Sequence, residues 1–309
     1  MELSVVMVGL SAIESIPIYH FMPGSRALRV LLKPYTSIDC KLGESRELEV
    51  CEWGRGPEVY PGVLVDVAWV KSIAGRWTHD VVFLDGVEPL AEASSVLRER
   101  VFDKPLCSRS QGLARVELPP WLDCILLEDL SLIAPQAVGN IADLLEASRN
   151  LGAHVEVAVY AEKAGDVESS ESVELAARYK TPLHVFVAES HWGGLRELYE
   201  KLRKANPYTY IHSGGFYEHD TYCENCGAIL AQRSRSTLVT IVEDPSCPRC
   251  GNPLPFREPR SRSWKRGVLR STRGKPFWVS VLALKIASGE ALSERGFESV
   301  PVDGSTENI

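Results

Sequence analysis

The sequence predicts an α/β protein with a mostly parallel sheet, followed by a small cysteine-rich unit. Between residues 27 and 212, short runs rich in β-branched residues alternate with longer amphipathic stretches, a pattern typical of βα units. Hydrophobic residues make up 45% of the 309 residues and charged residues 24%, enough for one large core and an appendage. Two CxxC pairs follow the last of these runs.

The first apolar run, residues 1–13, predicts a strand. It has no Lys or Arg before Arg26, so it lacks the basic start of a signal peptide, and we expect a cytoplasmic protein. Further strands are expected at 27–32, 48–51, 63–69, 81–84, 114–118, 124–127, 155–160, 183–187 and 209–212. Helices are expected at 90–101, 136–151, 170–179 and 194–204, where apolar residues recur near the helical period. No run approaches the ~20 apolar residues of a membrane helix, so a membrane is not an expected partner.

Composition changes after residue 205 indicate where the main unit ends. The pair Asn206-Pro207 ends the last expected helix, and the turn 213–215 follows the last strand. We therefore expect a first domain at 1–214, a cysteine-rich domain at 215–256 with hairpin arms at 228–232 and 237–242, and a segment at 257–309. In that last segment, an apolar run at 277–286 is expected to pack on the body and 303–309 to form a tail.

Charge divides the chain unevenly. Residues 1–205 carry 21 Lys and Arg against 30 Asp and Glu, whereas residues 206–309 carry 13 against 11. Residues 257–275 hold eight of these basic side chains with Glu258 as their one acid, so this arm is the segment through which nucleic acid or an acidic partner would bind. The negative first part opposes approach to phosphate.

The eight cysteines fall into two groups. Cys223, Cys226, Cys247 and Cys250 form two CxxC pairs, each followed by glycine and separated by a spacer that suits a hairpin. This spacing predicts a closed, structural Zn²⁺ site; two redox dithiols or two disulfides are the alternatives. Single cysteines are expected as small buried side chains at positions 40, 51, 107 and 124.

Two sequence segments resemble one protein family. Residues 16–28, IPIYHFMPGSRAL, resemble the segment before the cluster motif in radical SAM proteins of the pyruvate-formate-lyase-activating-enzyme-like type, especially the AmmeMemoRadiSam system branch. Residues 208–214, 220–227 and 247–251 resemble that branch's last strand and cysteine ribbon. The resemblance implies a partial (β/α) TIM-type barrel with its site at the carboxyl ends of the strands and a C-terminal zinc ribbon.

The resemblance also implies a [4Fe-4S] cluster that cleaves S-adenosylmethionine, held by a CxxxCxxC loop. Here residues 34–44, PYTSIDCKLGE, occupy that place and supply Cys40 alone. A cluster that needs three thiolates from this loop is therefore not expected. Residues 85–89, DGVEP, correspond to the family's GGEP motif, which meets the methionine end of the cofactor, with Gly86 and Glu88 retained and Val87 in place of the second glycine.

Several polar residues follow the expected strands. Glu88, Gly86 and His212 are the candidate cofactor-binding residues, with Glu88 as an acceptor for an amine. An acidic rim is expected from further residues at the strand ends: Glu128, Asp129, Glu162, Glu189 and His191. No residue is assigned as catalytic.

Three functions remain open. The leading one is a radical SAM-fold homologue without the cluster motif, non-catalytic or not a radical enzyme, which binds a small molecule or a protein partner. The second is an active enzyme with atypical cluster ligation or closed-shell chemistry at the rim. The third is a zinc-ribbon protein that binds nucleic acid or protein. Enzyme status, and whether S-adenosylmethionine still binds, are left open.

Overall fold

The structure is a computed structural model that describes residues 2–33, 62–86, 88–97, 102–113, 117–133, 139–188, 192–213, 216–234, 237–242, 244–258 and 277–281. Its strands are β1 Glu2–Ala12, β2 Arg26–Leu32, β3 Val63–Asp66, β4 Val81–Asp85, β5 Leu106–Ser110, β6 Leu122–Asp129, β7 His154–Ala161, β8 Leu183–Val187, β9 Thr209–His212, β10 Tyr217–Glu218, β11 Thr221–Tyr222, β12 Ile229–Ser234, β13 Thr237–Ile241 and β14 Phe277–Ser280. Its helices are η1 Ile13–Ser15, α3 Val67–Ala74, α4 Pro89–Glu92, α5 Ile141–Leu151, α6 Ala164–Val167, α7 Glu171–Tyr179 and α8 Trp192–Ala205.

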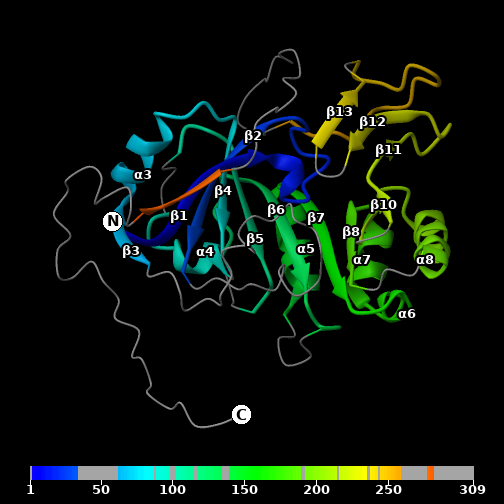
Figure 1. The fold of residues 1–309 in the computed structure, drawn as a ribbon, viewed down its shortest axis with the longest axis horizontal. Coiled ribbons are helices and arrows are strands. Elements are labelled where there is room, and N and C mark those ends of the chain that lie inside the picture. Colours follow the sequence, from blue (N-terminus) through cyan, green and yellow to red (C-terminus); the bar gives the residue numbers. More distant parts are fainter. Residues whose placement is uncertain are drawn as a thin grey trace, which may run out of the picture.

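An eleven-stranded sheet in the order β10-β9-β8-β7-β6-β5-β4-β2-β1-β14, with β3 also paired to β1, forms the centre of the protein (Figure 1). Neighbouring strands from β2 through β9 run parallel, whereas β1 and β10 are antiparallel to their neighbours. β3 and β14 pair with successive parts of β1. Within the described residues the sheet stays open, so the fold is mixed α/β with a mostly parallel, unclosed sheet.

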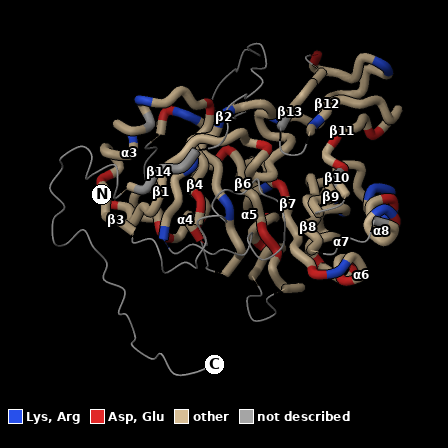
Figure 2. The backbone as a smooth tube through the Cα atoms, in the orientation of Figure 1, with Lys and Arg blue, Asp and Glu red and all other residues tan. Residues whose placement is uncertain are grey.

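The two faces of this sheet are covered differently. Alternate strand residues, such as Leu84, Ile125 and Val157, pack with residues of α3, α4, α5, α7 and α8 in one large apolar cluster. Charged residues are frequent along α6 and α8, at one edge of the fold (Figure 2). The opposite face, here called the inner face, packs apolar residues such as Phe83 and Leu126 against residues 13–22, and it also carries buried polar side chains.

The chain between η1 and β2 lies against the inner face. The amide of Ile13 donates to the Ser25 carbonyl at 3.0 Å, and Ile16, Ile18 and Phe21 are buried. The Met22 amide donates to the Arg257 carbonyl at 3.0 Å, so chain that follows the cysteine-rich part returns to this segment. Beyond it, β11, β12 and β13 form a separate three-stranded sheet.

Three predicted elements differ from those observed. The predicted strand 63–69 ends at Asp66, because its carboxylate accepts a hydrogen bond from the Ala68 amide at 2.7 Å and begins α3. Residues 117 and 118 are not in a strand; β5, at Leu106–Ser110, takes the place next to β6. Helix α4 ends at Glu92, well before residue 101. The predicted strand 48–51 and the cluster-loop residues 34–44 lie outside the described residues.

The other predicted strands and helices are present within a few residues of their expected bounds. The expected packing of the late apolar run is confirmed for Phe277–Ser280, which pairs with β1 as β14. In the described part of the chain, no helix combines the length and the apolar character that crossing a membrane requires.

Candidate functional site

A buried charged cluster crosses the inner face on neighbouring strands. Arg29 of β2 donates from Nε to the Asp85 carboxylate at 2.9 Å, and Asp85 also lies 2.9 Å from Nε of Arg109 on β5. Arg109 Nη1 then contacts Glu128 of β6 at 3.0 Å, and the hydroxyl of Tyr160 donates to the same carboxylate oxygen at 2.8 Å. The two arginines and two acids balance in formal charge.

This pairing determines the charge state of Asp85. Its side chain is 4% exposed, and burial by itself raises the pKa of a carboxyl group. The guanidinium groups of Arg109 and Arg29 outweigh burial and hold the pKa of Asp85 below its usual value.

The sequence predicted that Glu128 belongs to an acidic rim. In the structure, Glu128 pairs with Arg109 in the same ion-pair network, so it does not form a free acidic surface.

Gly86 directly follows β4, and Glu88 directly precedes α4. The Glu88 carboxylate accepts hydrogen bonds from the Ser110 hydroxyl at 2.6 Å and from the amides of Gln111 and Leu113, both at 2.9 Å. It thus joins the loop after β4 to the end of β5. Gly86 has a φ of +136°, a conformation that side chains rarely adopt.

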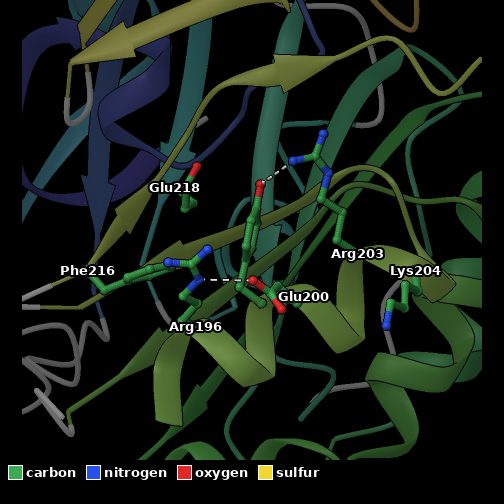
Figure 3. A pocket seen from close by; sticks show the side chains of 7 residues that line it. Arg196, Glu200, Arg203, Lys204, Phe216 and Glu218 are labelled. Atoms are coloured by element: carbon green, nitrogen blue, oxygen red, sulfur yellow. Dashed lines mark hydrogen bonds and ion pairs between the residues drawn. The ribbon is translucent and has the colours of Figure 1, made fainter. Parts of the chain in front are cut away.

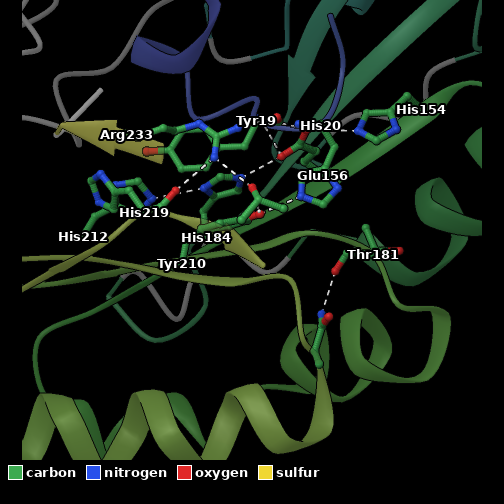
Figure 4. Close-up of polar contacts among 12 residues, drawn as sticks. Tyr19, His20, His154, Glu156, Thr181, His184, Tyr210, His212, His219 and Arg233 are labelled. Atoms are coloured by element: carbon green, nitrogen blue, oxygen red, sulfur yellow. Dashed lines mark hydrogen bonds and ion pairs between the residues drawn. The ribbon is translucent and has the colours of Figure 1, made fainter. Parts of the chain in front are cut away.

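A histidine cluster lies on the inner face beside the charged cluster, around Glu156 of β7 (Figure 4). Oε1 of Glu156 accepts from the amides of Tyr19 and His20 at 2.9 and 2.7 Å, and it lies 3.0 Å from His154 Nε2. Oε2 lies 2.7 Å from His184 Nε2. Burial raises the pKa of Glu156, but these histidine contacts outweigh it and hold the pKa well below its usual value.

A row of rings links the two clusters at the carboxyl ends of the strands. Tyr160, Phe186 and His212 stand in register on β7, β8 and β9. Tyr160 stacks on Phe186 with ring centroids 4.8 Å apart, and Phe186 stacks on His212 at 4.3 Å. Phe186 and His212 are partly exposed, so this aromatic row is not wholly buried in the core.

Arg233 of β12 connects the cysteine-rich sheet to the histidine cluster. Its guanidinium donates to the Tyr19 carbonyl at 2.8 Å and to the Thr221 hydroxyl at 2.8 Å, and it lies 4.2 Å from the centre of the Tyr19 ring. Thr221 in turn lies 2.8 Å from the Tyr210 hydroxyl of β9. One buried point therefore joins residues 16–22, the main sheet and the cysteine-rich sheet.

The four cysteines of the CxxC pairs come together, with all four sulfur atoms within 4.8 Å of one another. Sγ of Cys223 is 3.6 Å from Cys250, and Cys226 is 3.6 Å from Cys247. Zn–S bonds of ~2.3 Å at tetrahedral angles place sulfurs about 3.8 Å apart, so this donor set fits a Zn²⁺ ion. Such an ion would have four protein ligands and would supply structural stability.

The glycines after each pair explain the geometry of the cysteine turns. Gly227 and Gly251 have φ values of +70° and +72°. Their amides donate to the carbonyls of Cys223 and Cys247 at 2.9 and 2.8 Å. These two turns match each other, which is what the repeated CxxCG sequence indicates.

Two cavities are lined by other parts of the chain. One, of about 590 Å³, lies beside the basic side of α8 and is lined by Arg196, Tyr199, Glu200, Arg203, Lys204, Phe216 and Glu218 (Figure 3). The other, of about 680 Å³, lies where the amino ends of β7 and β8 meet the segment Pro253–Glu258. Neither is lined by Gly86, Glu88 or His212.

The structure thus places the predicted residues in three locations. Glu88 and Gly86 lie beside the charged cluster, His212 ends the aromatic row, and the cysteines are separate. Asp129 accepts from the Ser170 hydroxyl at 2.9 Å, Glu162 is exposed, and Glu189 and His191 lie outside the described residues. Of the single cysteines, Cys107 and Cys124 are buried, as expected, on paired strands.

Sequence reasoning missed Arg29, Asp85, Arg109, Glu156 and His184. All but Asp85 stand inside strands that are mostly apolar or buried. A charged or imidazole side chain within such a strand is itself a signal, because buried charges are rare without partners. The signal indicates that a partner exists and leaves its identity open.

Comparisons with known proteins give little support to any specific assignment. No family model matches the chain, and no curated protein matches it. Among solved structures, the chain is similar to QueE from Escherichia coli, with 15% identity over 70% of this chain and 95% of that chain and a TM-score of 0.42. A score this low carries no conclusion about function or about the particular fold family.

Proposed function

We propose that this chain is a radical SAM-type α/β protein that works without a [4Fe-4S] cluster and binds a small ligand at the aromatic row of its inner face. A Zn²⁺ ion held by Cys223, Cys226, Cys247 and Cys250 stabilises the cysteine-rich sheet. The family part of this proposal rests on the sequence resemblance at residues 16–28, 208–214, 220–227 and 247–251. The open, mostly parallel sheet with a polar inner face is the kind of scaffold that the resemblance implies.

The distribution of the eight cysteines supports the proposal most strongly. Four are together in the CxxC pairs, and Cys107 and Cys124 are fully buried in the middle of the main sheet. Cys40 and Cys51 are then the two that remain in the sequence. A cluster of the radical SAM type needs three thiolates and one open iron, so the chain is one ligand short.

The ligand site is inferred from what the inner face offers. Parallel α/β sheets bind ligands at the carboxyl ends of their strands. Here that end carries the partly exposed rings of Phe186 and His212 beside buried, paired charges. A flat, polar small molecule fits such a surface, since it can stack on a ring while its polar groups meet His212.

Metal analysis of anaerobically purified protein tests the cofactor part. We expect about one zinc per chain and no iron. Reconstitution with iron and sulfide should leave the iron–sulfur absorbance bands absent. About four irons per chain, lost in Cys40→Ser, would contradict the proposal.

A thermal-shift panel tests the ligand part. S-adenosylmethionine and related nucleosides are the first compounds, because the resemblance implies them. A ligand that binds the folded chain raises its melting temperature. The shift should be lost in Phe186→Ala. It should be retained in Lys204→Ala, because Lys204 lines the separate cavity beside α8.

A further inference from the structure

Three side chains on neighbouring strands form a continuous hydrogen-bonded chain. Glu156 Oε2 lies 2.7 Å from His184 Nε2, and His184 Nδ1 lies 3.1 Å from His212 Nε2. Glu156 and His184 are fully buried, whereas His212 is partly exposed at the end of β9. Figure 4 shows these side chains converging beneath Tyr19 and Arg233. The chain therefore leads from the buried sheet to the open end of the aromatic row.

The direction of each hydrogen bond follows from Glu156. This carboxylate already accepts from the amides of Tyr19 and His20, and an ionised carboxylate can only accept. His184 must therefore donate from Nε2. Burial lowers the pKa of His184, so its ring is neutral and Nδ1 carries a lone pair. That lone pair accepts the proton on His212 Nε2.

The second nitrogen of His212 is then unprotonated. Burial, followed by the nearby rings of His219 and His184, lowers the pKa of His212 well below its usual value, so this ring is neutral as well. Its Nδ1 makes no hydrogen bond to any residue that the structure describes. The neighbouring His219 ring, 4.4 Å away between centroids, uses its own Nε2 to contact the Ile211 carbonyl at 3.1 Å.

We infer that His212 is the hydrogen-bond acceptor of the inner-face site, with Nδ1 as the accepting atom and Glu156 and His184 as positioning residues. The inference rests on the proposed ligand site, and it narrows the ligand to a molecule that presents an N–H, O–H or S–H group at the aromatic row. The ligand keeps its proton and donates a hydrogen bond to Nδ1, because the low pKa of His212 keeps the ring neutral. Glu156, acting through His184, holds His212 in the Nε2–H tautomer that leaves Nδ1 able to accept.

The experiment is a long-range ¹H–¹⁵N correlation spectrum of histidine-labelled full-length protein at pH 7, which distinguishes the tautomers of each imidazole. Single His184→Asn and His212→Asn variants assign the signals. In the wild type, both residues should show the neutral Nε2–H pattern. A doubly protonated His184, or an Nδ1–H tautomer of His212, would overturn the inference without any substitution.

Glu156→Gln provides a second, directional test. The Tyr19 amide contacts both carboxylate oxygens, but the His20 amide donates to Oε1 alone, at 2.7 Å. It therefore orients the new side chain with its oxygen at the Oε1 position, so its NH₂ group faces His184 and donates. Both histidines should then switch to the Nδ1–H tautomer. Glu128→Gln is the matched control, because Glu128 is also buried but belongs to the charged cluster, two strands away from His184. This change should leave both tautomers unchanged.

An unchanged His212 tautomer in a folded Glu156→Gln variant would show that Glu156 does not determine it, and would overturn the inference. The metal content tests the proposed function, whereas the histidine spectrum tests this inference. Iron in the protein would therefore contradict the proposed function, and the tautomers in the spectrum would still support or overturn the inference.

Discussion

At the residue scale, buried charge in the charged cluster is tolerated because its four charged groups pair with one another. Arg29 and Arg109 share Asp85, and Arg109 also reaches Glu128, so the two positive charges have two negative ones within hydrogen-bond distance. Removing one member of such a network leaves an uncompensated charge in a site of low dielectric constant, which costs more than the pair contributes when intact.

Asp85→Asn should therefore reduce the free energy of unfolding by about 3–5 kcal/mol. The side chain keeps its size but no longer compensates the two guanidinium groups. Urea denaturation of the variant and the wild type measures the change. Glu168→Gln, which breaks the exposed pair with Lys201, is the control and should cost less than about 1 kcal/mol. A similar small cost for Asp85→Asn would mean that the network is solvated.

At the scale of elements, the cysteine-rich sheet is small and depends on its anchors. Its apolar cluster is small: Leu230 and the cysteines are packed with Ala228, Val242, Leu254 and Phe256. Arg233 and Thr221 hold this sheet to Tyr19 and Tyr210. The proposed Zn²⁺ ion would add further stability to this small sheet.

Cys226→Ser should lose the zinc ion and unfold this sheet locally. Hydrogen exchange should rise for amides in residues 221–254 while strands β4 to β9 stay protected, because the main sheet has its own core. Zinc content and exchange rates measure the two effects. Cys124→Ala, outside the cluster, should keep its zinc. Loss of protection throughout the chain would instead show that both sheets unfold as one unit.

At the scale of the whole molecule, an acid is buried where the parts of the chain meet. Glu14 of η1 is 1% exposed. Its Oε1 accepts from the Gly24 amide at 2.6 Å, and its Oε2 has no hydrogen-bond partner among the residues that the structure describes. Burial raises the pKa of Glu14 from 4.5 to about 7, although Arg233 and the Gly24 amide oppose the shift. The folded protein therefore binds this proton more tightly than the unfolded chain does.

Global stability should accordingly carry a pH-dependent contribution from Glu14. Because the folded pKa is above the unfolded one, stability is lost as pH rises from about 4.5 to about 7, and the loss is complete above that range. The total is up to ~3 kcal/mol. Glu14→Gln should remove this contribution, so the difference in unfolding free energy between variant and wild type should grow across this window. Two parallel stability curves would contradict the assignment.

Local patterns in the sequence were sufficient for much of the fold. The periodicities that predicted β2, β4, β6 to β9, α5, α7 and α8 depend on residues close along the chain, and the CxxCG repeats predicted the cysteine cluster for the same reason. β5 was missed because its sequence, LCSRS, has no β-branched residues. The strand predicted at 63–69 was too long because Asp66 begins a helix inside an apolar run.

The inner-face site depended on contacts between distant residues. Asp85 meets Arg29 across 56 residues of sequence, and Glu156 meets His20 across 136. Parallel strands are joined by long crossovers, so their order and register do not follow from local periodicity. The amino-acid sequence by itself was enough to predict most of the strands and helices and the grouping of the four CxxC cysteines. Only the tertiary structure decided which buried charges and histidines meet, because those pairs form when the strands take their register.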